Sequence, residues 1–258
     1  MSLDYYGYRK KFALLVPSTN TAVEVEYNKM KPEGVVLATR GCVIPAFKVT
    51  NEDEFVGMVK AIGDATAQGL RDALTCRPDH VIFGYSAETF WDGKERSDRE
   101  FAKYNDIAKQ EGHCQITFGA QAIMDALKCY PGVKRIGVVT PYMPVGDNMV
   151  VKFLGDIGYD VVRIAGHSSP GPVEIAHESF GKTRQLVKDV DGDDVDLILQ
   201  AGTNLYFVEL AAQLEKELGK PVLAINALTF WHALRSNGIP DKIYGFGSLL
   251  EEHTSIPQ

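Results

Sequence analysis

Residues 81–90, VIFGYSAETF, carry the pattern that decides the fold: an apolar strand that ends in small and hydroxyl residues just before an aromatic side chain. The same pattern returns at 197–207 as LILQAGTNLYF. A second pair follows in the same order, QITFGAQAIMDALKCYPGVKRIG at 115–137 and VLAINALTFWHALRSNGIPDKIYG at 222–245, each with a strand, a small-residue turn and a helix containing Ala-Leu. Two matches in one order favour a pair of pseudo-symmetric half-molecules.

Short apolar runs alternate with helical stretches along the whole chain. The runs are apolar without alternation, which is typical of parallel strands covered on both faces by helices. We therefore expect an α/β fold of two halves, each a mainly parallel sheet flanked by helices: residues 1–120, to which 237–258 return, and residues 121–236, with the active cleft between them. The expected strands are 11–16, 35–44, 79–83, 115–118, 135–140, 161–165, 196–200 and 222–225, and the expected helices include 21–30, 53–74, 98–111, 145–157, 173–189 and 205–218.

Composition places the chain among ordinary globular proteins and excludes several classes of function. Of its 258 residues, 45% are hydrophobic and 24% are charged. The net charge of −7 argues against a nucleic-acid surface, which needs Lys and Arg to neutralise phosphates. No apolar run approaches the roughly 20 residues that span a bilayer, and residues 1–11 show no secretory signal. We expect a cytoplasmic protein with no membrane or nucleic-acid partner.

Cysteine and histidine spacing gives no sign of a metal or a disulfide framework. The four cysteines include no CxxC pair, and the six histidines are scattered along the chain. Neither GxGxxG nor a phosphate-binding loop of the GxxxxGK type is present, so no nucleotide cofactor is expected. The prediction is an enzyme or binding protein without cofactor or metal.

Polar side chains follow five of the expected strands, at the edge where a parallel sheet binds its ligands. Hydroxyls, amides and backbone N–H groups at helix N-termini bind carboxylate or phosphate, because unpaired donors and the helix dipole both favour an anion. The alternative for each single residue is a helix N-cap. Convergence of several strand ends favours an anion site. The candidates are Ser18, Asn20, Ser86, Tyr142, His167, Thr203 and Asn204.

Four segments carry a resemblance to a known family. They are VPSTNTAVEVEYNKMKPEGV (16–35), DHVIFGYSAETFWDG (79–93), RIGVVTPYMPVGDNMVVKFLGDIGYDVV (135–162) and DLILQAGTNLYFVEL (196–210). The chain resembles the maleate cis-trans isomerase and arylmalonate decarboxylase branch of the Asp/Glu racemase superfamily. The resemblance implies two Rossmann-like halves that enclose a small carboxylated substrate, with Asn20, Ser86, Tyr142, Thr203 and Asn204 binding it.

The family also places one cysteine at a strand end in each half, and both are replaced in this sequence. Tyr85 stands where the first thiol is expected, and Gly202 where the second is expected. The resemblance therefore implies that anion binding is retained while proton transfer has changed. Tyr85 is the first replacement acid, provided that its pKa of about 10 is lowered, and His167 is the second because it titrates near neutrality. Glu88 and His232 are weaker candidates.

The resemblance, with the residues that carry it, implies an enzyme that acts on a small mono- or dicarboxylate through a stabilised carbanion or enediolate. A decarboxylase-like lyase without catalytic cysteines suits the site best, since it needs a nest of donors and one proton donor. A cis-trans isomerase or racemase with other acid and base groups, and a carboxylate-binding protein without catalysis, are the alternatives. A homo-oligomer is possible. A cysteine restored at Gly202 is expected to enter a site still shaped for a thiol.

Overall fold

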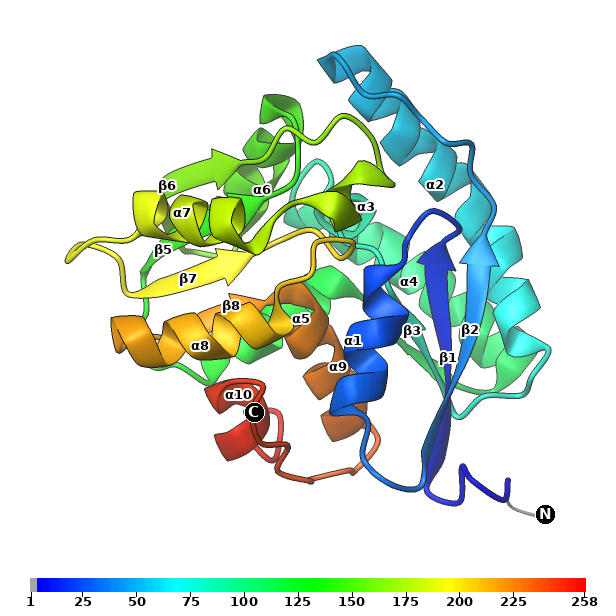
Figure 1. The fold of residues 1–258 in the computed structure, drawn as a ribbon. Helices are drawn as coiled ribbons and strands as arrows, with labels where there is room; N and C mark the ends of the chain where they lie inside the picture. The colour runs from blue at the N-terminus through cyan, green and yellow to red at the C-terminus, as the bar shows by residue number, and fades with distance from the viewer. Residues whose placement is uncertain (1–3) are drawn as a thin grey trace.

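The structure, a computed structural model, describes residues 4–258 and contains two four-stranded parallel sheets of identical topology. The strand order is β2-β1-β3-β4 in the first sheet and β6-β5-β7-β8 in the second, so each strand has a counterpart four strands later. Figure 1 shows the sheets side by side with helices over them. The predicted α/β fold of two similar halves is confirmed. Over residues 4–258, no helix is both long and apolar enough to cross a membrane.

The first sheet and its helices come from the N-terminal part of the chain. β1 pairs in parallel with β2 on one side and β3 on the other, and β4 completes the sheet beside β3. All four residues of β3 are buried, as expected for a central strand covered on both faces. The elements are β1 (Lys10–Pro17), α1 (Ala22–Met30), β2 (Val35–Cys42), α2 (Glu52–Leu74), β3 (His80–Phe83), α3 (Ala87–Phe90), α4 (Lys94–Gly112), β4 (Gln115–Thr117) and α5 (Gly119–Lys128).

The second sheet repeats this arrangement. β5 is its inner strand, paired with β6 and β7, and β8 lies beyond β7. The β7 strand is entirely buried, like its counterpart β3. The elements are β5 (Arg135–Thr140), α6 (Pro144–Asp156), β6 (Asp160–Gly166), η1 (Glu174–His177), α7 (Phe180–Val190), β7 (Leu197–Gln200), α8 (Val208–Leu218), β8 (Val222–Ala224), α9 (Ile225–Ser236) and α10 (Ser248–Glu252).

Three expected helices have different limits in the structure. The helix expected at 98–111 begins four residues earlier, as α4 at Lys94. The helix expected at 173–189 is interrupted: a short 3-10 turn ends at His177, and α7 begins after Ser179, whose side chain accepts a hydrogen bond from the Lys182 amide. The helix expected at 205–218 begins only at Val208. Its first amides are bound by a carboxylate from the other half, a long-range contact that local sequence does not reveal.

The C-terminal segment contacts both halves of the molecule. Asp241 forms an ion pair with Arg9 at 2.6 Å, just before β1. Ser248 shares a 2.8 Å hydrogen bond with Tyr130, and its amide donates to Glu215 of α8 at 2.7 Å. The division of the chain at residue 120, with the C-terminus returning to the first half, stays a prediction.

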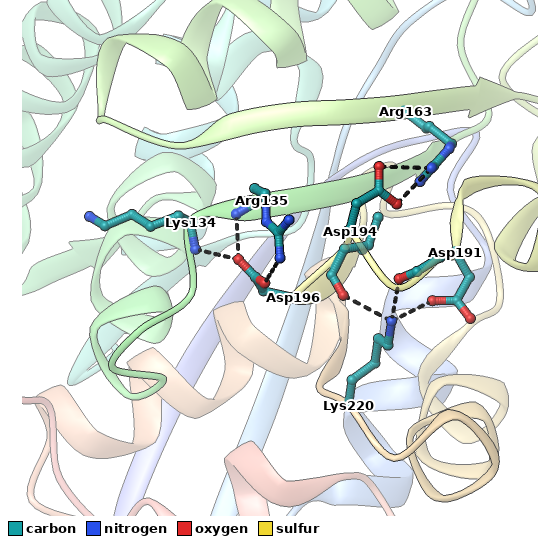
Figure 2. A network of polar contacts seen from close by, with 9 residues as sticks. Lys134, Arg135, Arg163, Asp191, Asp194, Asp196 and Lys220 are labelled. Atoms are coloured by element: carbon teal, nitrogen blue, oxygen red, sulfur yellow. Dashed lines mark hydrogen bonds and ion pairs between the residues drawn. The ribbon is translucent and has the colours of Figure 1, made fainter.

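A polar network closes the second sheet at the end opposite the strand ends considered above (Figure 2). Lys220, just before β8, pairs with Asp191 at 2.8 Å and donates to the Val195 carbonyl at 2.8 Å. Asp196 pairs with Arg135 at 2.8 Å. These contacts hold the loop at 191–196 against the amino end of β5 and the residues just before β8.

Candidate active site

A cavity lies at the carboxyl ends of β1, β3 and β7, where the two halves meet. Its empty space is about 430 Å³ including its mouth. It brings together most of the side chains that the sequence analysis selected. Among those that line it are Asn20, Tyr85, Ser86, Glu88, Tyr142, Thr203 and Asn204, together with Gly202.

The predicted substrate-binding side chains pair with one another across the two halves. Asn20 donates through Nδ2 to the Thr203 hydroxyl at 3.2 Å, and that hydroxyl donates to the Gly84 carbonyl at 3.1 Å. Ser86 and Tyr142 share a hydrogen bond of 2.8 Å between their hydroxyls. Both pairs join one half to the other, so a bound anion could recruit donors from both sides.

Two of these residues also cap the first helix. The Asn20 carbonyl oxygen accepts from the amides of Ala22 and Val23 at 3.0 and 3.1 Å. Asn204, from the other half, accepts from the amides of Thr21 and Ala22 at 2.9 and 3.2 Å. The side-chain oxygens of Asn20 and Asn204 are therefore helix caps, as the alternative interpretation expected. Their Nδ2 groups donate to other partners: Thr203 for Asn20, and the Thr19 and Pro172 carbonyls for Asn204.

A buried carboxylate from the first half caps the N-terminus of α8 in the second half. Glu26 of α1 accepts from the amides of Phe207 and Val208 at 2.8 and 2.9 Å. It also accepts from Asn226 at 2.6 Å, and Asn226 donates to the Thr203 carbonyl at 2.8 Å. Burial raises the pKa of Glu26 above its usual value, against the effect of these hydrogen bonds. Sequence reasoning missed this residue, although it stands four positions from Ala22 and Met30 on the buried face of the helix.

Tyr85 occupies the wall of the cavity. Its hydroxyl donates to the Thr66 hydroxyl of α2 at 2.8 Å. Burial raises the pKa of Tyr85 well above 10. The condition for Tyr85 to serve as the acid, a lowered pKa, is not met, and the structure gives no support to that role.

Glu88 lies in the cavity without a counter-charge. None of the described residues that line the cavity is Lys or Arg. Desolvation raises the pKa of Glu88 to about 7, and no residue from another element within 4–258 donates a hydrogen bond to its carboxylate. A carboxyl in such a site exchanges its proton near neutral pH, which is the property required of a general acid or base. This residue, only a weaker candidate in the sequence analysis, is the best placed titratable group in the cavity.

Gly202 cannot carry a side chain in this backbone. Its φ is +121°, and a Cβ built there would lie 2.3 Å from Cδ and 2.5 Å from Cγ of Pro141. Real Cβ atoms do not approach other carbon atoms so closely. The expectation that a cysteine would fit at this position is wrong, because the proline ring already fills the space.

The comparison with protein families decides the relationship. The family model for arylmalonate decarboxylase matches residues 12–250. The chain belongs to the arylmalonate decarboxylase family. The curated relatives that it matches are maleate isomerases: the Geobacillus stearothermophilus enzyme is 23% identical over 93% of this chain and 96% of its own, and the Pseudomonas putida enzyme is 25% identical over 92% and 95%.

Solved structures of this arylmalonate decarboxylase family and of maleate isomerases share the fold. The Nocardia farcinica maleate cis-trans isomerase bound to TRIS superposes with a TM-score of 0.84 at 18% identity, over 94% of this chain and 98% of that one. Arylmalonate decarboxylase gives a TM-score of 0.73 at 17% identity, over 93% and 98%. The protein is therefore an enzyme of the isomerase or decarboxylase class within the arylmalonate decarboxylase family.

None of the four cysteines lines the cavity of this family member. Burial raises the pKa of Cys42 to about 12 and those of Cys114 and Cys129 to about 11. Thiols in this state are poor nucleophiles at neutral pH. By contrast, a cysteine-to-serine mutant of the N. farcinica isomerase has been solved with a covalently bound succinylcysteine intermediate.

Ser18 and His167 lie outside the cavity lining. The Ser18 hydroxyl accepts from the Ile44 amide at 3.1 Å and so holds the segment after β2. His167 is buried, with Nε2 3.0 Å from the Thr183 hydroxyl and Nδ1 2.9 Å from a Glu178 oxygen. Burial lowers the pKa of His167 below its usual value. The His167 imidazole therefore does not lie in the cavity, where a catalytic acid or base would have to be.

His232 is also placed elsewhere, within a chain of buried polar groups. Its Nδ1 lies 3.0 Å from the Thr117 hydroxyl and its Nε2 3.2 Å from an Asp125 oxygen.

Among residues 4–258, no three His, Cys, Asp or Glu side chains are grouped as ligands for a metal ion.

Proposed function

We propose that this enzyme decarboxylates a small dicarboxylate of the malonate type, through an enediolate and without thiol catalysis. One carboxylate leaves as CO₂, and the electron pair of the broken bond passes to the remaining carboxylate. The enediolate is then protonated at carbon. Such a reaction needs donors that hold the developing charge and a single proton donor.

The donors are neutral side chains from both halves. Asn20 donates to the Thr203 hydroxyl, which donates to the Gly84 carbonyl, and the Ser86 and Tyr142 hydroxyls share one hydrogen bond. A substrate carboxylate placed between the partners would receive hydrogen bonds from both halves in place of these pairs. Preorganised donors in a closed site stabilise a developing oxyanion by several kcal/mol.

The choice of reaction depends on one observation: at Gly202, where the family has its second cysteine, the Pro141 ring leaves no room for a side chain. Racemisation or thiol-based isomerisation needs chemistry on two faces of the substrate. Gly202 offers no functional group, and the Pro141 ring leaves no space for one. A reaction that requires one proton donor fits this asymmetry better.

Cis-trans isomerisation is the second candidate, because the curated relatives are maleate isomerases. The deciding experiment offers the purified protein methylmalonate, phenylmalonate, maleate and a racemisable amino acid, and follows CO₂ release and the proton NMR spectra. We expect CO₂ and a monocarboxylate from a malonate. Fumarate formed from maleate without CO₂ release would assign the isomerase. Tight binding without turnover of any compound would indicate a carboxylate-binding protein.

A further inference from the structure

We propose that Glu88 is the proton donor of this site, and that it regains its proton from a second, wider cavity on its other side. The inference rests on the proposed decarboxylation and deepens it. Two features of the structure support it, the position of Glu88 and the charge around it. The proton balance of the reaction supports it as well.

Glu88 stands in the wall between two cavities. The wider one has about 1000 Å³ of empty space including its mouth and lies between α2 and α4. Only Tyr85 and Glu88 line both cavities among the described residues. Because the Tyr85 hydroxyl is bound to Thr66, Glu88 is the group that can exchange a proton with either side.

The wide cavity opens to solvent. Lys60 and Asp64 line it, and their side chains are 75% and 67% exposed. These two are paired with each other at 2.6 Å, and Lys103 lies 3.4 Å from Glu100. The charged and titratable groups around Glu88 are Lys60 and Asp64 from α2, Arg96, Glu100, Lys103 and Tyr104 from α4, Tyr85 beside it, Tyr142 across the substrate cavity and Cys42 from β2.

Charge in the substrate cavity favours a protonated Glu88 when the substrate binds. The cavity holds no described cation, so a malonate dianion would be repelled by an ionised Glu88. Burial already raises the pKa of Glu88 to about 7, and a bound dianion would raise it further. The substrate therefore draws one proton onto the carboxyl as it binds.

The proton balance of the reaction is then complete. The C–C bond to one carboxylate breaks, CO₂ leaves and an enediolate forms. The O–H bond of Glu88 breaks as a C–H bond forms on the enediolate carbon, which gives the monocarboxylate and an ionised Glu88. That carboxylate takes a proton from water through the wide cavity. The sum is one dianion and one proton converted to one monoanion and CO₂.

The test compares Glu88→Gln with Glu88→Asp, and uses Glu95→Gln as a matched control because the Glu95 side chain is 88% exposed on α4. With phenylmalonate or methylmalonate, we expect Glu88→Gln to lose about 10²–10⁴-fold in kcat while the control is unchanged. The unmodified protein should lose kcat at high pH, as Glu88 becomes ionised. Glu88→Asp should retain part of the rate and show the same loss of kcat at high pH. Circular dichroism checks that each variant is folded.

Calorimetry gives a readout that does not depend on turnover. Binding of succinate, a dicarboxylate that cannot lose CO₂ as a malonate does, to the unmodified protein at pH 8 is measured in two buffers of different ionisation enthalpy and should take up close to one proton per site. Glu88→Gln should take up none and bind at least as tightly. CO₂ release by Glu88→Gln at the unmodified rate, or binding without proton uptake, would overturn the assignment of Glu88 alone. Absence of CO₂ release from any malonate by the unmodified protein would overturn the proposed function and the donor step with it.

Discussion

Substitution of Gly202 by Ala tests the closure of the second-half position directly. The added Cβ would lie 2.3 Å from Cδ of Pro141, at a residue whose φ is +121°. Backbone strain at a positive φ costs about 1–2 kcal/mol, and overpacking of a filled site costs about 1–3 kcal/mol. We expect a loss of roughly 2–5 kcal/mol in the free energy of unfolding, which lowers Tm by about 4–20 °C in a protein of this size.

The assay is urea and thermal unfolding followed by circular dichroism, with two glycine controls. Gly219→Ala has a φ of +65° and no atom within 4 Å of its Cβ, so it reports strain alone, about 1 kcal/mol. Gly57→Ala lies in α2 with no neighbour within 4 Å and should stabilise the protein by roughly 0.5–1 kcal/mol. Adding Pro141→Ala to Gly202→Ala should recover the steric part and leave the strain. A Gly202→Ala protein as stable as the unmodified one would refute the reasoning.

The other predictions concern the thiols, the Glu88 carboxyl and the substrate-binding donors. A variant in which Ser or Ala replaces all four cysteines should keep its kcat/KM, and iodoacetamide inactivation that substrate prevents would contradict this. Glu88→Gln should be more stable than the unmodified protein by up to about 3 kcal/mol at pH 8 and equal to it below pH 4.5 in urea unfolding. The native pKa of about 7 exceeds the ordinary 4.5, so the native carboxyl binds more protons than the unfolded one and stability falls as pH rises between these values; a difference independent of pH would argue against burial as the cause. Tyr142→Phe should lower kcat/KM by roughly tenfold to a hundredfold with little change in Tm, because one hydrogen bond to an anion is lost. Asn20→Ala should lower kcat/KM similarly and also lose about 1 kcal/mol of stability, because it caps α1; unchanged kcat/KM in either variant would return that residue to a structural role.

The fold and most of the cavity residues could be predicted from the sequence. Apolar runs without alternation identify parallel strands, and the carboxyl ends of such strands meet at one edge of a sheet. For this reason Asn20, Ser86, Tyr142 and Thr203 could be placed together without coordinates. Their pairing across the halves could not, since it depends on how the two sheets are oriented.

The state of the titratable groups could not be predicted in the same way. Whether Tyr85 or Glu88 is the better acid depends on how far each side chain is removed from water in the folded protein. His167 follows a strand as expected, but Thr183 and Glu178 fold back on it from a segment predicted as part of one continuous helix. The pKa of a side chain depends on residues that are close in space but distant in sequence. A short sequence motif does not show which residues these are.

Each half of the molecule supplies a side chain that caps a helix of the other half, which couples the stabilities of the two halves. Asn204 closes the first turn of α1, and Glu26 closes the first turn of α8. A fragment cut between the two sheets would leave α1 with only its Asn20 cap and α8 without its Glu26 cap. In the N-terminal piece Glu26 would lose every donor that stabilises its charge. We therefore expect the two halves to unfold in one cooperative transition, so that a substitution that destabilises one half also lowers the stability of the other.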